Sequence, residues 1–331
     1  MKLTGKLLCF VSIIAMTIIY SSCFKKDKPV VLPAPGDAKV YSVGMGSNYA
    51  TQVYFRLSDG KTTANPFKVW DLAFETSLSG YHIWMNGGNM QWIANSHSTN
   101  FSAVTDTIGL NFMYDVSSWS IDSNAVGEYL TAGASSLSKN EVYVIDRGDS
   151  VPQNARFKKF IIRTENDASY FLVYANLDGT FADSLTIVKN PSYTYSYFNF
   201  ENGQLNFEPL KTDWDILFTR YRYVFTNQTP VLPYLVNGVL LNQGTLVALD
   251  TTQKFDSIDL AFAQSKSFSS KKDFIGFGWK YYDFPSATYL TKSHFNYIIK
   301  DRNGVYFKLH FVDFYNDLGE KGYPKFELKQ L

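Results

Sequence analysis

Cysteine is almost absent from this chain. Only Cys9 and Cys23 occur among its 331 residues, and both lie close to the N-terminus. If both belong to an export segment, the folded part has no thiol for a disulfide, a thiolate nucleophile or a cysteine zinc site. The hydrophobic core must then stabilise the fold alone, and a chain of this length can bury a sizeable one.

Long apolar runs are also missing. The longest, 7–20, has 14 residues, whereas a membrane-spanning helix needs about 20. Lys2 and Lys6 precede it, and Tyr20-Ser21-Ser22-Cys23 follows it. Small residues before a cysteine resemble a bacterial lipobox, so we expect 1–22 to be a lipoprotein signal peptide and Cys23 to carry the lipid. The alternative is an ordinary signal peptide with a chance cysteine.

Residues 23–40 have the composition of a tether. Prolines at 29, 33 and 35 favour extended polyproline geometry, and the lysines before them suit a solvated run near lipid headgroups. The formal net charge of the whole chain is only +1, which predicts no nucleic-acid partner. We therefore expect a membrane partner, reached through the lipid anchor, on the periplasmic or the outer side of an outer membrane.

Common catalytic motifs are absent as well. The sequence has no Gly-x-Ser-x-Gly elbow, no phosphate-binding Gly-x-x-x-x-Gly-Lys-Ser/Thr loop and no His-Glu-x-x-His helix. Asp250, Asp256 and Asp259 do not have the spacing of a calcium-binding EF-hand. We therefore expect a binding protein, not an enzyme.

Aromatic residues, in contrast, are abundant. They make up 17% of the chain, nearly as much as the 18% of charged residues, and they favour half-buried strands. Alternating patterns predict an all-β fold with strands at 51–57, 69–75, 141–146, 157–164, 169–175, 193–200, 214–225, 235–241, 245–249, 288–300 and 306–314. Asn303-Gly304 predicts a hairpin turn, and 257–264 suits one short helix capped by Ser257.

The sequence repeats itself over a long interval. Tyr54 to Gly60, followed by Trp70-Asp71, recurs as Tyr197 to Gly203, followed by Trp214-Asp215. The offsets are 197 − 54 = 143 and 214 − 70 = 144. This interval is the size of a domain and too long for a solenoid repeat. We expect two tandem β-sheet units, 41–190 and 191–331, in which the tryptophans pack and the aspartates accept hydrogen bonds at strand ends.

These motifs together resemble the HmuY family of haem-binding lipoproteins from Bacteroidetes-type bacteria. The likeness includes Cys23 with its Lys- and Pro-rich tether, the strand and turn at 197–203, and Trp214 to Tyr221. It continues in the C-terminal hairpin that runs into Phe311 to Tyr315, and in a last aromatic strand, 322–331. The second unit is the closer match.

The resemblance implies a membrane-anchored protein that binds haem outside the cell, takes part in iron acquisition and passes haem to an outer-membrane transporter. In the family, two histidines or two methionines ligate the iron. The stretch that corresponds to one ligand position, 276–285, holds neither residue type. It does hold Tyr281 and Tyr282, which are candidates for the haem pocket and could in principle ligate the iron; ordinary aromatic strand residues are the alternative. His294 and His310 lie in the hairpin and are expected on strand faces.

The first unit is richer in such ligands. His82, Met85, Met90 and His97 lie within 16 residues of one another. Imidazole and thioether both ligate haem iron, so we take these four as candidate ligands, the methionines first. Trp84 and Trp92 are candidates for stacking on a porphyrin. Met45 and Met113 are weaker candidates, and methionines that simply fill the core are the alternative.

Arg220 and Arg222 alternate with tyrosines along one expected strand. They are candidates to contact haem propionates, and a solvated arginine face is the alternative. At the level of the whole protein, the alternative to haem binding is a haem-free cell-envelope scaffold, or a glycan- or protein-binding lipoprotein that uses its aromatic loops.

Overall fold

A computed structural model describes residues 37–131, 137–148 and 151–331, with the side chains of 164–166 left aside. These described residues form one compact unit. The expected signal peptide, Cys23 and most of the tether fall outside the described residues. Within them, none of the helices has the length and apolar character needed to cross a membrane.

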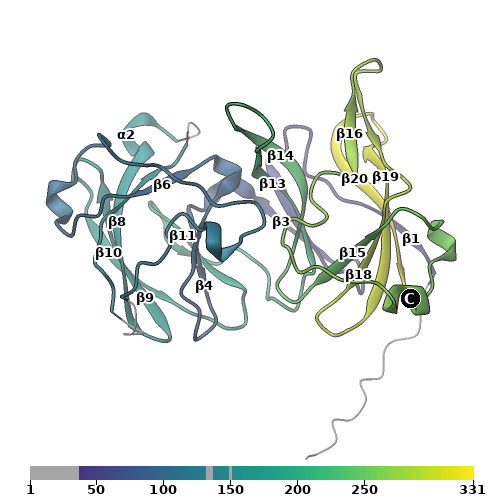
Figure 1. The fold of residues 1–331 in the computed structure, drawn as a ribbon, viewed down its shortest axis with the longest axis horizontal. Helices are drawn as coiled ribbons and strands as arrows, with labels where there is room; N and C mark the ends of the chain where they lie inside the picture. The colour runs from purple at the N-terminus through teal and green to yellow at the C-terminus, as the bar shows by residue number, and fades with distance from the viewer. Residues whose placement is uncertain (1–36, 132–136, 149–150) are drawn as a thin grey trace, which may run out of the picture. The chain divides into compact units, whose positions relative to one another are not determined.

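The fold is all-β, as the alternating patterns predict, and the strands form antiparallel sheets (Figure 1). One five-stranded sheet has the order β1 (Lys39–Ser42), β20 (Lys321–Gln330), β19 (Tyr306–Tyr315), β18 (Asn296–Lys300) and β15 (Leu246–Asp250). The other has the order β10 (Asp183–Val188), β9 (Ser169–Asn176), β8 (Phe157–Asn166), β7 (Tyr143–Asp146) and β6 (Trp92–Asn95).

Two four-stranded sheets mix strands from both sequence units. The first has the order β12 (Gly203–Leu205), β11 (Tyr195–Asn199), β4 (Leu72–Glu75) and β5 (Ile83–Met85). The second has the order β14 (Leu232–Leu241), β13 (Ile216–Phe225), β2 (Thr51–Phe55) and β3 (Thr62–Pro66). Each unit therefore gives its first hairpin to a sheet of the other unit, and Figure 1 shows β11 beside β4 although the two are far apart in sequence.

The repeated Trp-Asp motifs hold these exchanged hairpins. Trp70 packs edge-to-face on Tyr197 with ring centroids 5.0 Å apart, and Trp214 packs on Tyr54 at 4.9 Å. Asp215 accepts the Leu57 N–H at 2.8 Å. Asp71 likewise accepts the backbone N–H of residue 200, at 3.1 Å. The two aspartates thus accept hydrogen bonds at strand ends, as expected, but their donors belong to the opposite unit.

The hydrophobic core divides along the same line. Leu72, Ile162 and Phe198 belong to a cluster of buried side chains that all come from residues 72–200. Phe55, Phe218 and Phe326 belong to another, drawn from residues 43–57 and 216–328. We call 67–207 the inner body, and 37–66 together with 208–331 the outer body.

Short helical elements lie in the connections. The helix α3 (Leu260–Gln264) is capped by Asp259, whose carboxylate accepts the Phe262 N–H at 2.8 Å, so the expected cap Ser257 is wrong. Ser257 instead ends η5 (Phe255–Ser257). The other elements of this kind are η1 (Phe67–Val69), η2 (Gly87–Asn89), η3 (Phe101–Ala103), η4 (Ile121–Ser123) and α2 (Gln153–Arg156).

The expected long strand at 288–300 is also wrong. It is broken into β17 (Thr288–Thr291), which pairs with β16 (Lys280–Asp283), and β18, which joins a different sheet. A turn closed by a hydrogen bond from Phe295 N–H to Lys292 O separates them. The last two residues of the expected tether, 39–40, begin β1, which pairs with β20.

Candidate functional site

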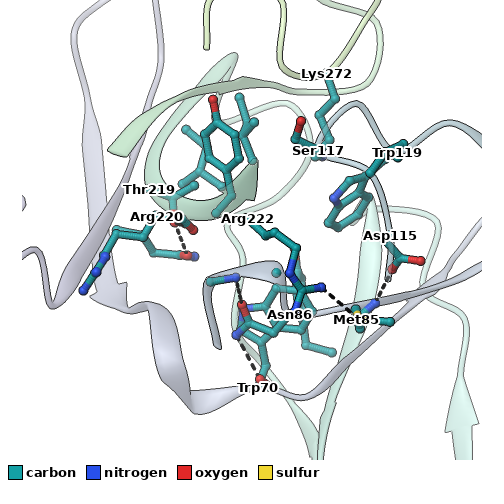
Figure 2. A pocket seen from close by; sticks show the side chains of 18 of the residues that line it. Trp70, Met85, Asn86, Asp115, Ser117, Trp119, Thr219, Arg220, Arg222 and Lys272 are labelled. Carbon is teal, nitrogen blue, oxygen red and sulfur yellow. Dashed lines mark hydrogen bonds between the residues drawn. The ribbon is translucent and has the colours of Figure 1, made fainter. Parts of the chain in front are cut away.

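The structure contains a small cavity where η2 of the inner body packs on β13 of the outer body (Figure 2). Trp70, Met85, Asp115, Arg222 and Lys272 are among its lining residues. Its volume is about 40 Å³. That is room for a water molecule and far less than a porphyrin requires. The small cavity is therefore a packing feature between the two bodies.

Arg222 is one of the principal side chains of the small cavity. It is 1% exposed, and its guanidinium donates to Gln91 O at 2.6 Å and lies 4.5 Å from the ring centroid of Trp92. Burial lowers its pKa to about 10. The expectation of a solvated arginine face is wrong for this residue because the segment from Met85 to Trp92 covers that side of β13.

Buried acids and a buried amine surround this cavity. Burial raises the pKa of Asp115 to about 7, although its carboxylate accepts the N–H groups of Met85 and Ala125. Burial lowers the pKa of Lys272, and the nearby Glu208 opposes this shift. The Lys272 ammonium lies 4.1 Å from the centroid of Trp119. Of these contacts, the one between Lys272 and Trp119 joins the two bodies.

The four candidate ligands of the first unit do not line one common cavity. Met85 is 1% exposed and belongs to the core of the inner body, with its sulfur 3.9 Å from the Arg222 guanidinium. His82 lies 2.8 Å from Glu75, and His97 lies at the surface beside Glu141. Met90 ends η2 in a left-handed conformation. Only Met85 of these four lines the small cavity.

The stacking candidates of the first unit are also engaged elsewhere. Trp84 is stacked on Trp119, with centroids 5.1 Å apart, and Trp92 carries the Arg222 guanidinium on its ring. The glycines of this stretch do allow a close approach, but to protein backbone. A Cβ added to Gly88 would lie 2.8 Å from Arg220 O.

A much larger groove lies on the outer body, between β13–β14 and the β16–β17 hairpin. Its volume is about 460 Å³, within the range of roughly 300–1,000 Å³ typical of small-molecule sites. Seven aromatic residues line it: Tyr49, Phe225, Tyr234, Phe277, Tyr281, Tyr282 and Tyr289. We call it the tyrosine groove.

Three basic side chains, Arg220, Lys280 and Lys321, also line the tyrosine groove, and no carboxylate does. Within the described part of the chain, none of the three forms an ion pair. Burial lowers the pKa of Arg220, and only the Tyr49 phenol opposes that shift. Burial lowers the pKa of Lys280 to about 7, so this amine is only partly protonated near neutral pH. The positive charge of the groove therefore comes mainly from Arg220 and Lys321, and no lining carboxylate offsets it.

Several polar atoms of the groove lack hydrogen-bond partners. The Nε of Arg220 and the side-chain oxygen of Asn237 are buried and unpaired. The Lys280 ammonium has three N–H groups and donates one, to Asn237 O at 2.6 Å. Buried unpaired groups are costly, so this set fits a ligand that brings acceptors for the cations.

Three sequence candidates meet in the groove, namely Arg220, Tyr281 and Tyr282. In Figure 2 the Arg220 side chain points away from Arg222 and Met85. Sequence reasoning missed Tyr49, Phe225, Tyr234, Phe277, Lys280, Tyr289 and Lys321. Only the placement of Lys280 beside Tyr281 offered a local signal, because the others come from separate strands and loops.

The all-β fold and the repeated hairpin motifs define a β-sheet protein built from two related units. A family model for the HmuY protein matches residues 48–179 and 192–328. The chain therefore belongs to the HmuY family, as two copies in tandem. These two matched segments cross the boundary between the inner and outer bodies.

Solved structures resemble the chain at low identity. PinO from Porphyromonas gingivitis, in its apo form, is 10% identical, covers 89% of this chain and 98% of its own, and has a TM-score of 0.35. The apo HmuY analogue of Tannerella forsythia is 11% identical, with coverage of 90% and 98% and a TM-score of 0.26. A HmuY-like protein of Bacteroides vulgatus is 15% identical, with coverage of 54% and 93% and a TM-score of 0.22. No curated protein matches the chain.

Proposed function

We propose that this protein is a non-enzymatic haem- or porphyrin-binding lipoprotein of the cell envelope, and that the tyrosine groove is its binding site. Membership of the HmuY family supports the ligand class. The composition of the groove supports its assignment as the binding site, because aromatic walls and unpaired cations suit a flat ligand that carries carboxylates.

The observation that carries this proposal is the charge of the groove. Arg220, Lys280 and Lys321 line it without any carboxylate, in a chain whose overall net charge is only +1. Lys321 is exposed, but Lys280 is buried and Arg220 is half-buried. Desolvated cations usually have a protein partner, so these two unpaired groups at a large aromatic groove favour an anionic ligand. A neutral sugar would leave these charges unpaired.

Each group has a defined role in binding. The rings of Phe225, Phe277 and Tyr282 offer apolar faces for a macrocycle, and their burial by ligand would supply much of the affinity. Arg220 offers a planar fork of N–H donors to a carboxylate. Lys280 is held between Trp279 and Phe314, with its nitrogen 4.2 and 4.8 Å from their centroids, so its position is fixed before a ligand arrives.

The cellular setting belongs to the same proposal. Lipidation of Cys23 would hold the protein at the outer membrane through the tether, facing the periplasm or the cell surface. Haem bound in the groove would then pass to an outer-membrane transporter. A globomycin-sensitive shift in size, lost in Cys23→Ser, is expected if the lipid is attached.

A titration of the full chain with ferric haem and with metal-free protoporphyrin tests the site. We expect saturable quenching of tryptophan fluorescence by both. Arg220→Gln should weaken both by about tenfold, the effect of losing one charge-assisted pair of about 1.4 kcal/mol. Arg163→Gln is the matched control, because Arg163 is an exposed arginine on β8 of the inner body.

The results separate the alternatives. Equal weakening by the Arg220 and Arg163 variants would place the porphyrin outside the groove. Loss of binding in Met85→Ala with Met90→Ala would place it at the first unit. No binding of either porphyrin would remove the haem proposal and leave the scaffold or glycan-binding alternative.

A further inference from the structure

The tyrosine groove offers few side chains that can bind iron. Neither histidine nor methionine lines it, so the usual nitrogen and thioether ligands of haem are absent from its walls. Its possible ligands are the phenol oxygens of its tyrosines and the amine of Lys280. Phenolate is a hard, anionic ligand of ferric haem, and this chemistry differs from that of a histidine or methionine pair.

Tyr49 is distinguished from the other tyrosines by its backbone. Its φ is 56°, in the left-handed region that bulky side chains rarely adopt. Its N–H donates to Gly46 O at 2.9 Å, which closes the turn. Gly322 approaches the ring so closely that an added Cβ would lie 3.1 Å from it. Strained backbone of this kind is concentrated at binding and catalytic sites.

The Tyr49 ring is also fixed in orientation. It is stacked on Phe314, with centroids 6.1 Å apart and planes 15° apart. Its hydroxyl donates to no other described residue, although the ring is only partly exposed. Tyr49 therefore presents a preorganised oxygen to the groove, which lowers the entropic cost of ligation.

Two cations flank this ring. The guanidinium carbon of Arg220 lies 5.9 Å from its centroid, and the Lys321 nitrogen lies 5.7 Å from it. Burial raises the pKa of the Tyr49 phenol, the neighbouring phenols of Tyr289 and Tyr315 raise it further, and the charge of Arg220 opposes the shift. Arg220 would stabilise a negative oxygen at this position, and no carboxylate of the groove would repel it.

We propose that Tyr49 supplies an axial oxygen ligand to ferric haem in the tyrosine groove, and that Arg220 and Lys321 position and stabilise it. On ligation the phenol proton is lost to solvent and the phenolate oxygen replaces a water molecule, so atoms and charge balance. This inference rests on the proposed function. It predicts a preference for trivalent iron, because an anionic oxygen favours the higher charge.

Lys280 is the rival ligand. Its amine lines the groove and has a lowered pKa, but it already donates to Asn237 O at 2.6 Å. The two ligands have different spectra. A phenolate gives a ferric complex with a phenolate-to-iron charge-transfer band, whereas an amine gives a complex without that band.

The test compares the full chain with Tyr49→Phe, using ferric haem, gallium(III) protoporphyrin and metal-free protoporphyrin as probes. We expect the wild type to bind both trivalent metal porphyrins more tightly than the metal-free one. Tyr49→Phe should lose about tenfold or more for the trivalent probes and stay within about twofold for the metal-free one. Tyr306→Phe is the matched control, because Tyr306 is a half-buried tyrosine of β19 that does not line the groove.

The outcomes are distinct. A charge-transfer band that is present in the wild type and in Tyr306→Phe, but absent in Tyr49→Phe, supports the inference. A complex without this band, whose spectrum changes in Lys280→Leu but not in Tyr49→Phe, overturns it and leaves porphyrin binding in the groove intact. Equal affinity for all three probes overturns it too, whereas failure of every probe to bind the wild type overturns the proposed function as well.

Discussion

At the scale of single residues, the two Trp-Asp aspartates differ in their charge environment. Asp71 forms a bidentate pair with Arg147, at 2.8 and 2.9 Å. Asp215 is equally buried but has no such partner, and burial raises its pKa to about 6 from an ordinary 3.8. The same motif therefore buries a paired charge in one unit and an unpaired one in the other.

We predict a pH-dependent cost at Asp215. Its folded pKa lies above its unfolded value, so the native state binds the extra proton between about pH 4 and 6. The free energy of unfolding should fall as pH rises through this window and stay lower at pH 7. Asp215→Asn keeps an acceptor for the Leu57 N–H and removes the charge. Its stability relative to wild type should rise by on the order of 2–3 kcal/mol from pH 4 to 7.

Urea unfolding of both proteins at pH 4, 5, 6 and 7 measures this difference directly. Other buried acids contribute to the pH dependence of each protein but cancel in the comparison. A difference that stays constant over the whole range would contradict the raised pKa of Asp215.

Single residues also show where sequence reasoning ends. The alternation of Arg220 and Arg222 with tyrosines predicted one shared face, yet Arg222 is buried under the inner body while Arg220 reaches the tyrosine groove. The environment of Arg222 depends on a segment more than 100 residues away. Tyr49 carries no local motif at all, because its role comes from neighbours on β13 and β20.

At the scale of elements, the repeated motifs predicted most strands but not their partners. Tyr54 and Tyr197 begin equivalent hairpins, and β4 and β13 are equivalent strands. Each hairpin therefore has two nearly identical edges on which to pair, one in its own unit and one in the other. Register rules are the same for both choices, so only the tertiary structure distinguishes them.

The exchanged pairing can be tested by cross-linking. Glu75 and Tyr195 are directly opposite on β4 and β11, and opposite residues of antiparallel strands lie within disulfide range. In a background with Cys9 and Cys23 replaced by serine, Glu75→Cys with Tyr195→Cys should form a disulfide within the chain. In an unexchanged pairing Tyr195 would instead face Thr219, so Tyr195→Cys with Thr219→Cys is the control.

Mass spectrometry of the oxidised proteins gives the readout. A disulfide in the first variant and free thiols in the control are expected. The reverse result would mean that each hairpin pairs within its own unit.

At the scale of the whole molecule, the sequence repeat and the physical bodies do not coincide. The repeat divides the chain into 41–190 and 191–331, and the HmuY matches follow it. The clusters of buried side chains divide it into 67–207 and the remaining described residues. The repeat boundaries reflect sequence similarity, whereas the boundaries of the core depend on which strands share a sheet. Because the hairpins are exchanged between the units, the two sets of boundaries differ.

This difference predicts which fragment folds alone. Fragment 67–207 contains every strand of two sheets and the whole core that includes Leu72 and Phe198. Fragment 41–190 lacks β11 and β12 and carries β2 and β3 without β13. It would leave Phe74 and the edge of β4 uncovered, and exposed apolar edges of this kind lead to aggregation.

We therefore expect 67–207 to unfold cooperatively in urea and to give a dispersed NMR spectrum. It should be less stable than the full chain, because the contacts of Arg222 with Gln91 O and Trp92 are lost. Fragment 41–190 should aggregate or lack a cooperative transition. A cooperative transition in 41–190 but not in 67–207 would contradict this expectation. It would show that a sequence unit can pair its first hairpin with its own strands when it is alone. The exchange of hairpins would then occur only when the two units are joined in one chain.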